Sequence, residues 1–140
     1  GVVNDPFIDV PNNGDFLICN IVGGNPEEGK IAIGEILKEG QLVQFHLRDS
    51  NTSSENLKIM LEDYKSDQER YDQFGALLFS CLGRGSYLYG EADHDTNMFK
   101  ALIGEIPLTG FFCNGEIGPV GDTTYIHGYT SSFGIIKPKK

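Results

Sequence analysis

The chain contains only three cysteines. Their spacing argues against a disulfide framework and against a zinc site. Cys19, Cys81 and Cys113 lie far apart, so there is no close pair of the kind that builds disulfide frameworks or zinc sites. Reduced thiols and a cytoplasmic location fit this pattern best. The sequence also contains no H-E-x-x-H, D-x-D-x-D or G-x-x-x-x-G-K pattern, and we therefore expect no metal and no cofactor.

Basic residues are in the minority. Twenty Asp and Glu stand against eleven Lys and Arg, which gives a net charge of -9, and such a chain repels nucleic-acid phosphates and anionic lipids. No apolar run approaches the roughly 18 residues needed to cross a bilayer, and the N-terminus shows no secretory signal pattern. We therefore expect neither nucleic acid nor a membrane as a partner.

The size and composition are those of one globular domain. The chain has 140 residues, of which 39% are hydrophobic, including nine Phe and six Tyr, and this is enough for one core. The turn-rich residues 1–13 are predicted to be an extended lead-in from an upstream domain. Residues 14–137 are predicted to be the domain itself, and residues 138–140 a basic tail.

The first half of the chain is predicted to hold three strands and a helix. The strands cover residues 16–22, 30–33 and 41–48, and in the last of these apolar and polar residues alternate as in a strand with one buried face. Thr52 to Glu55 forms a capping-box pattern that predicts the start of a helix. The largely apolar stripe of that helix consists of Leu57, Leu61, Tyr64, Gln68 and Tyr71.

The second half is predicted to alternate between strands and one more helix. Residues 76–82 are almost continuously apolar, as expected for a central strand buried on both faces. A helix capped by Asp93 or Asp95 and closed by Gly104 follows. A strand at 108–113, a loop at 114–122 and a long strand at 124–136 complete the chain. The prediction is an α+β fold in the order β-β-β-α-β-α-β-β, with two helices on a mixed, mainly antiparallel sheet.

The glycine-rich segment 110–121 is the first candidate site. Glycines permit positive φ and close approach, and successive backbone N–H groups in such a loop can hold an anion. A β-turn between two strands requires the same residues. The spacing alone does not separate these two interpretations.

Cys81, near the C-terminal end of the predicted central strand, and Arg84, just past that strand, form the second candidate. Cys81 as a nucleophile would need His94 or His127 as base and Glu116 as orienting group, but no cysteine-hydrolase signature surrounds it. A buried, inert thiol is the favoured interpretation, and we expect no enzymatic activity. Arg84 could clamp a carboxylate or phosphate, or equally form a structural ion pair with one of the acidic residues.

Three segments together resemble the C-terminal FIST domain: residues 43–49 (VQFHLRD), 78–85 (LFSCLGRG) and 110–119 (GFFCNGEIGP). Their order and spacing also match, most like stand-alone bacterial or plant-type members. The resemblance implies an intracellular sensory module of signal-transduction proteins, thought to bind small ligands such as amino acids, that follows an N-terminal FIST half. In eukaryotes such domains are joined to F-box segments. It implies no catalytic residue and no cofactor, and the matching motif residues are Cys81, Arg84, Asn114, Gly115, Glu116 and Gly118.

Two hypotheses of function follow, from different classes. In the first, Arg84 and the loop at 114–118 hold the carboxylate of a small metabolite, and Glu116 takes its amine. In the second, the domain is a protein-interaction module that presents Phe111, Phe112, Ile117 and Tyr129 to a partner. A closed pocket favours a ligand and an exposed apolar patch favours a partner, so the burial of these residues bears on the choice.

Overall fold

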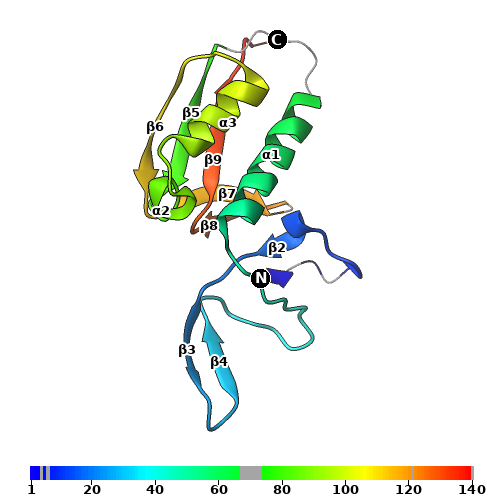
Figure 1. Ribbon diagram of the computed structural model, residues 1–140. Coiled ribbons are helices and arrows are strands. Elements are labelled where there is room, and N and C mark those ends of the chain that lie inside the picture. The colour runs from blue at the N-terminus through cyan, green and yellow to red at the C-terminus, as the bar shows by residue number, and fades with distance from the viewer. Residues whose placement is uncertain (4, 6, 67–73, 121, 140) are drawn as a thin grey trace. The chain divides into compact units, whose positions relative to one another are not determined.

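The structure is a computed structural model that describes residues 1–3, 5, 7–66, 74–120 and 122–139 (Figure 1). The chain forms two compact units. The first comprises Gly1–Leu47 and Ile117–Gly128, and the second Arg48–Glu116 and Tyr129–Lys140. The fold class is α+β with mainly antiparallel strand pairing, as the sequence predicts.

The first unit consists of short strands. They are β1 (Val2–Val3), β2 (Phe16–Leu17), β3 (Ile21–Asn25), β4 (Lys30–Ile33), most of β7 (Glu116–Val120) and β8 (Thr123–His127), with a 3-10 turn at Asn13–Asp15. β1 pairs with β2, and β3 with β4, both antiparallel. β7 pairs with β8. The β3–β4 turn forms because the Asn25 side chain accepts backbone N–H groups of Glu27 and Glu28, while Gly29 takes a φ of 64°.

The predicted strand at 41–48 is not formed, which corrects the sequence analysis. Instead, an isolated bridge from Val2 to Val43 and a few hydrogen bonds to Gly1 and Val3 attach this segment, which belongs to no strand. Val43, Phe45 and Leu47 are exposed rather than buried. Alternating apolar and polar residues show which side chains share a face, but a strand also needs a neighbouring strand to pair with. The neighbour here is β1, which lies within the predicted lead-in and is two residues long, too short to pair with all of 41–48.

The second unit carries the longer elements. They are α1 (Ser50–Ser66), β5 (Gly75–Cys81), α2 (Ser86–Tyr89), α3 (His94–Ile103), β6 (Leu108–Cys113) and β9 (Ser131–Ile136). The sheet order is β6-β5-β9, so the predicted central strand is confirmed. β5 runs parallel to β6 and antiparallel to β9. The short α2 was not predicted.

Helices α1 and α3 lie on the same side of this sheet and enclose the core (Figure 1). Leu57 and Leu61 from α1 meet Ala76 of β5 and Phe99 of α3, all buried. Phe99 stacks on Phe133 with ring centroids 5.3 Å apart. Of the predicted stripe on α1, Gln68 and Tyr71 lie outside the described residues. Burial of each Leu side chain removes its apolar surface from water and stabilises the fold by about 2 kcal/mol.

Helix α1 begins earlier than predicted. It starts at Ser50, and the residue before it, Asp49, accepts the Thr52 backbone N–H at 2.9 Å and the Thr52 hydroxyl at 2.7 Å. These hydrogen bonds lower the pKa of the Asp49 carboxyl. The capping group is therefore Asp49, because its carboxylate reaches an N–H group that the helix leaves without a partner.

The C-terminal third also differs from the prediction. The expected loop at 114–122 contains β7, and the expected strand at 124–136 is divided into β8 and β9. The break falls at Tyr129, whose φ of 63° is left-handed and interrupts an extended strand. The glycine-rich segment therefore supplies a strand as well as turns.

Gly110 marks a close approach between β5 and β6. A Cβ atom there would lie 1.7 Å from the backbone oxygen of Leu78, and a backbone cannot move aside as a flexible side chain can. We expect Gly110→Ala to lower the free energy of unfolding by about 3 kcal/mol. In the control Gly134→Ala, the new Cβ would lie 3.9 Å from the Leu77 Cβ, and we expect a change within about 0.5 kcal/mol. Equal urea-unfolding curves for the two variants would contradict this reading.

Candidate functional site

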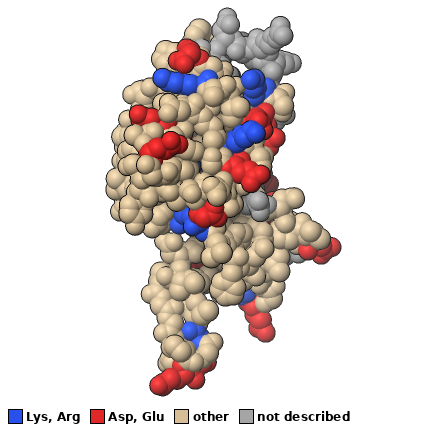
Figure 2. Space-filling view, in the orientation of Figure 1, with Lys and Arg blue, Asp and Glu red and all other residues tan. Residues whose placement is uncertain are grey.

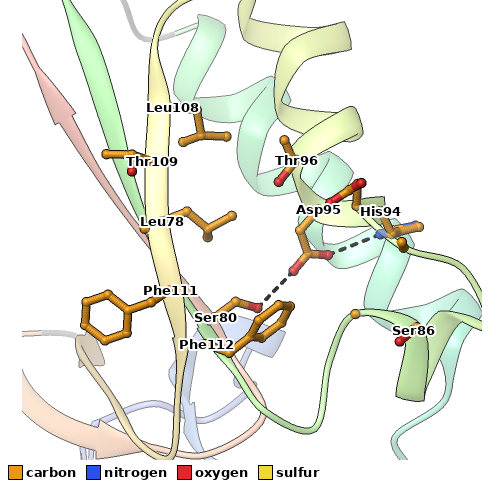
Figure 3. Close-up of a pocket in the computed structure, with 14 residues that line it drawn as sticks. Leu78, Ser80, Ser86, His94, Asp95, Thr96, Leu108, Thr109, Phe111 and Phe112 are labelled. Carbon is orange, nitrogen blue, oxygen red and sulfur yellow. Dashed lines mark hydrogen bonds and ion pairs between the residues drawn. The ribbon is translucent and has the colours of Figure 1, made fainter.

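A cavity of about 410 Å³ lies between the sheet of the second unit and the start of α3 (Figure 3). Its apolar wall includes Leu78, Leu108 and Phe112. Ser80, Ser86, His94, Asp95 and Thr96 provide polar groups. A cavity of this size, mainly apolar with a few convergent polar groups, is typical of small-molecule sites.

The sheet register explains which side chains reach the cavity. Leu78 pairs with Gly110, and Ser80 with Phe112, in the parallel β5–β6 ladder, so these residues share the face that meets α3. Figure 3 shows the Phe112 ring on the side of Asp95 and the Phe111 ring on the opposite side of β6. Between Leu108 and Phe112, Gly110 adds no side chain to the face.

Arg84 and Asp95 form a buried ion pair beside the cavity. The Arg84 Nε donates to Asp95 Oδ2 at 2.8 Å, and Nη2 donates to Oδ1 at 3.1 Å. Both residues are buried, and the paired geometry is the strong bidentate form. Arg84 Nη1 also donates to the Tyr129 carbonyl at 3.3 Å, and Nη2 to the Tyr89 hydroxyl. Arg84 therefore forms a structural ion pair, which is one of the two roles that the sequence allows for it.

The Asp95 carboxylate has further partners. The Ser131 hydroxyl donates to Oδ2 at 2.6 Å, and His94 Nδ1 lies 3.1 Å from Oδ1. The Ser80 hydroxyl, 3.5 Å from Oδ2, also lies 3.0 Å from the Ser131 hydroxyl. Burial alone raises the pKa of Asp95, but hydrogen bonds from Arg84 and Ser131 and the charge of Arg84 outweigh it and lower the pKa to about 2. The carboxylate is therefore charged at neutral pH.

His94 connects the cavity to α1. Its ring borders the cavity, Nε2 lies 3.0 Å from the Ser54 hydroxyl, and the ring stacks on Tyr89 with centroids 3.6 Å apart. Burial raises the pKa of Tyr89 to about 12, so its hydroxyl stays protonated. The thiol hypothesis used His94 as a base for Cys81, whereas the ring hydrogen-bonds to Ser54 and Asp95.

The local structure explains both glycines beside Arg84, Gly83 and Gly85. A Cβ on Gly83 would lie 2.4 Å from the Tyr129 ring, and the Arg48 guanidinium covers that ring at 3.8 Å from its centroid. Gly85 takes a φ of 62° as α2 begins. The Gly-Arg-Gly sequence thus lets Tyr129 pack closely and turns the chain into α2.

Glu116 is buried and ties the end of β6 to the start of β9. It accepts the Thr130 hydroxyl at 2.9 Å and the Thr130 backbone N–H at 3.2 Å. The Cys113 thiol lies 3.4 Å from Glu116 Oε1. Burial raises the pKa of this thiol, and the hydrogen bond to Glu116 raises it further.

The six motif residues do not line this cavity. Arg84 and Cys81 lie at the end of β5, and Glu116 is engaged with Thr130. Gly118 belongs to the first unit, where its carbonyl oxygen lies 2.9 Å from His127 Nε2. Asn114 and Gly115 form the turn between β6 and β7. Their role as ligand contacts stays a prediction, and Gly85 and Gly110 are the neighbouring motif positions that border the cavity.

Figure 2 shows Asp and Glu side chains in several separate groups on the visible face, some of them beside Lys or Arg. Over the described ranges, no group of three or more His, Cys, Asp or Glu side chains is placed to hold a metal ion. None of the helices within those ranges is long and apolar enough to cross a membrane.

The second unit is a small α+β fold with a cavity of metabolite size, and comparison with known proteins identifies the family of the chain. Residues 1–119 match the FIST C domain. The chain belongs to this family, as the three sequence segments suggested. The family implies a sensory domain of signal-transduction proteins.

The relatives are longer proteins. An uncharacterised protein of Mycobacterium tuberculosis (strain ATCC 25618 / H37Rv) is 41% identical over 135 residues, which cover 96% of this chain and 35% of the relative. An uncharacterised Mycobacterium bovis protein is 38% identical with the same coverage. An Arabidopsis thaliana F-box/LRR-repeat protein is 24% identical over 86% of this chain and 26% of its own length. The chain thus spans about a third of the mycobacterial relatives.

The Arg84–Asp95 pair predicts a specific acid sensitivity. Because the folded pKa of Asp95, about 2, lies below the ordinary 3.8, its contribution to stability is complete above pH 4 and lost as the pH falls through 2. The free energy of unfolding should therefore drop by about 2 kcal/mol more in the wild type than in Asp95→Asn between pH 4 and pH 2.

Chemical denaturation at several pH values measures this difference. Asp63→Asn, at an exposed position on α1, is the control and should keep the wild-type pH dependence. The Asp95→Asn variant should also be less stable at pH 7, because Arg84 loses its buried counter-charge. Parallel pH profiles for the wild type and Asp95→Asn would refute the assignment.

Proposed function

We propose that this chain is the small-ligand-binding part of a sensory protein, and that its ligand is an amino acid or another small carboxylate bound in the cavity beside α3. The observation that supports this most is the cavity itself. Its volume of about 410 Å³ suits a metabolite, and it combines an apolar wall with hydroxyl, imidazole and carboxylate groups.

The chemistry of the cavity fits an amphipathic ligand. An apolar side chain would lie against Leu78, Leu108 and Phe112. At the other end, the first backbone N–H groups of α3 have no partner within the helix and favour a carboxylate. Asp93 also borders the cavity, and its negative charge would attract an amine.

The ion pair makes the binding of an anion feasible. An unpaired Asp95 would repel a ligand carboxylate, but Arg84 compensates its charge at 2.8 Å. In this proposal Arg84 acts through Asp95 and does not clamp the ligand directly, which revises the role first expected for it. Ser86 and Thr96 hydroxyls would complete the polar contacts.

A protein-interaction module is the second candidate, and one observation favours it. Phe111, Phe112 and Ile117 are exposed, although large apolar residues on strands are ordinarily buried. Of these three, Phe112 borders the cavity at a site where a ligand would cover it. Phe111 faces away from α3 (Figure 3). A ligand in the cavity would therefore not cover it.

We further propose that the domain is not an enzyme and that it works in the cytoplasm. Cys81 is 6% exposed, which leaves little room for a substrate at its sulfur. The Cys113 thiol has a raised pKa and so forms less of the reactive thiolate at neutral pH.

Ligand binding is tested by thermal shift and calorimetry with the twenty amino acids and matched amines and carboxylic acids. An apolar amino acid should raise the melting temperature, and its decarboxylated amine should do so less. Phe112→Ala should weaken binding at least tenfold because it removes the aromatic wall. Phe111→Ala, at the next position of the same strand but on the other face, should bind as the wild type does. No shift with any compound, or equal losses in both variants, would overturn the proposal.

Thiol reactivity tests the non-enzymatic assignment. In the folded chain, iodoacetamide should modify Cys81 at least tenfold more slowly than in the chain unfolded by urea, because the sulfur is buried. Mass spectrometry of time-quenched samples follows each cysteine separately. Modification of Cys81 in the folded chain as fast as in urea would indicate an accessible, activated thiol.

A further inference from the structure

The sheet of the second unit has two apolar faces, and the helices cover one. Residues that alternate with those of the core face form the other, here called the outer face. β5 contributes Leu77 and Phe79 to it, β6 contributes Phe111, and β9 contributes Ile136. The remaining positions of the outer face are Thr, Ser, Cys or Gly, so no charged side chain belongs to it.

Three of the four large apolar side chains of the outer face are exposed to solvent in this structure. Phe111 is 64% exposed, Ile136 51% and Leu77 37%, while Phe79 contacts Phe111 with ring centroids 5.2 Å apart. A solvated sheet face normally carries polar or charged residues, and 22% of this chain is charged. A charge-free face on three adjacent strands is instead the pattern of a sheet covered on both sides.

We infer that the outer face is the docking surface for the portion of polypeptide that the mycobacterial relatives carry outside the matched stretch. The matched stretch covers 96% of this chain but 35% of the relative, so most of the relative lies outside it. The occupant presents an uncharged, apolar surface, because a charge placed against Leu77 and Phe111 would lose its hydration without a partner.

Two further observations favour this occupant. In the described part of the chain, β6 and β9 are the edges of the sheet and pair with no further strand, so the occupant can extend the sheet as well as cover it. A second copy of this chain is a poorer partner, because each copy has a net charge of -9 and two copies repel each other. This inference is independent of the cavity and its ligand.

The test uses the 140-residue chain with an affinity tag, co-expressed with the untagged remainder of the Mycobacterium tuberculosis relative. The remainder should co-purify at a one-to-one ratio. Phe111→Ala and, separately, Ile136→Lys should each weaken the complex at least tenfold, because one removes an aromatic anchor and the other places a charge on the outer face. Ile136→Lys alters an exposed side chain, so it is informative even if Phe111→Ala is unstable.

Tyr87→Ala is the control, because Tyr87 is a highly exposed aromatic residue on α2 and lies outside the sheet. It should leave the complex unchanged. The inference is overturned if the remainder does not co-purify, or if all three variants bind equally. It is also overturned if the chain alone is a dimer that Ile136→Lys dissociates, since the outer face would then bind a second copy.

Discussion

The structure of the second unit depends on one buried interaction, the pair between Arg84 and Asp95. A buried carboxylate is costly unless a cation and hydrogen-bond donors surround it, and here Arg84, Ser131 and His94 all contact it. The partners come from the end of β5, the start of β9 and the start of α3. The pair therefore fixes the strand ends against the helix that borders the cavity. It also sets the charge of the cavity, since it leaves Asp95 compensated.

The two faces of the same sheet have separate purposes in this interpretation. Residues in register with Ser80 and Leu78 face α3 and form the core and cavity wall. Their immediate neighbours Leu77 and Phe111 face the other way and remain exposed. Phe111 and Phe112, adjacent in sequence and alike in chemistry, thus belong to different surfaces. The proposed ligand cavity and the proposed docking surface are therefore compatible, because they lie on different sides of the sheet.

Much of the second unit could be predicted from the sequence, because its signals are local and strong. The apolar run at 76–82 indicated the central strand, and Leu57 and Leu61 indicated the buried side of α1. The strand predicted at 41–48 is wrong, because alternation shows which side chains share a face but not whether a neighbouring strand exists. Tyr129 divided the last strand through a left-handed conformation that its residue type does not signal.

The candidate site was harder to predict than the fold. The sequence indicates a role for Arg84 and offers an ion pair as one alternative, but with twenty acidic residues it gives no way to choose Asp95 as the partner. For Asp95 the sequence predicts a different role, since it offers Asp93 or Asp95 as the helix cap. The cavity combines short stretches of β5, β6 and α3, and its polar residues, such as Ser86 and Thr96, carry no distinctive motif. Such a site is formed by residues that are distant in the sequence and meet only in the fold. The sequence alone does not show which of them meet.

The position of the ion pair along the chain also bears on the order in which this unit can assemble. Arg84 and Asp95 are 11 residues apart, whereas Ser131 is 36 residues from Asp95 and 51 from Ser80. Closing a short loop has a lower entropic cost than closing a long one. The stretch from β5 to β6 can therefore form its crossover and internal charge pair early, and β9 then completes the hydrogen bonds to a carboxylate that is already held. In kinetic terms, the short sequence separations favour formation of the β5–β6 stretch before the C-terminal strand joins it.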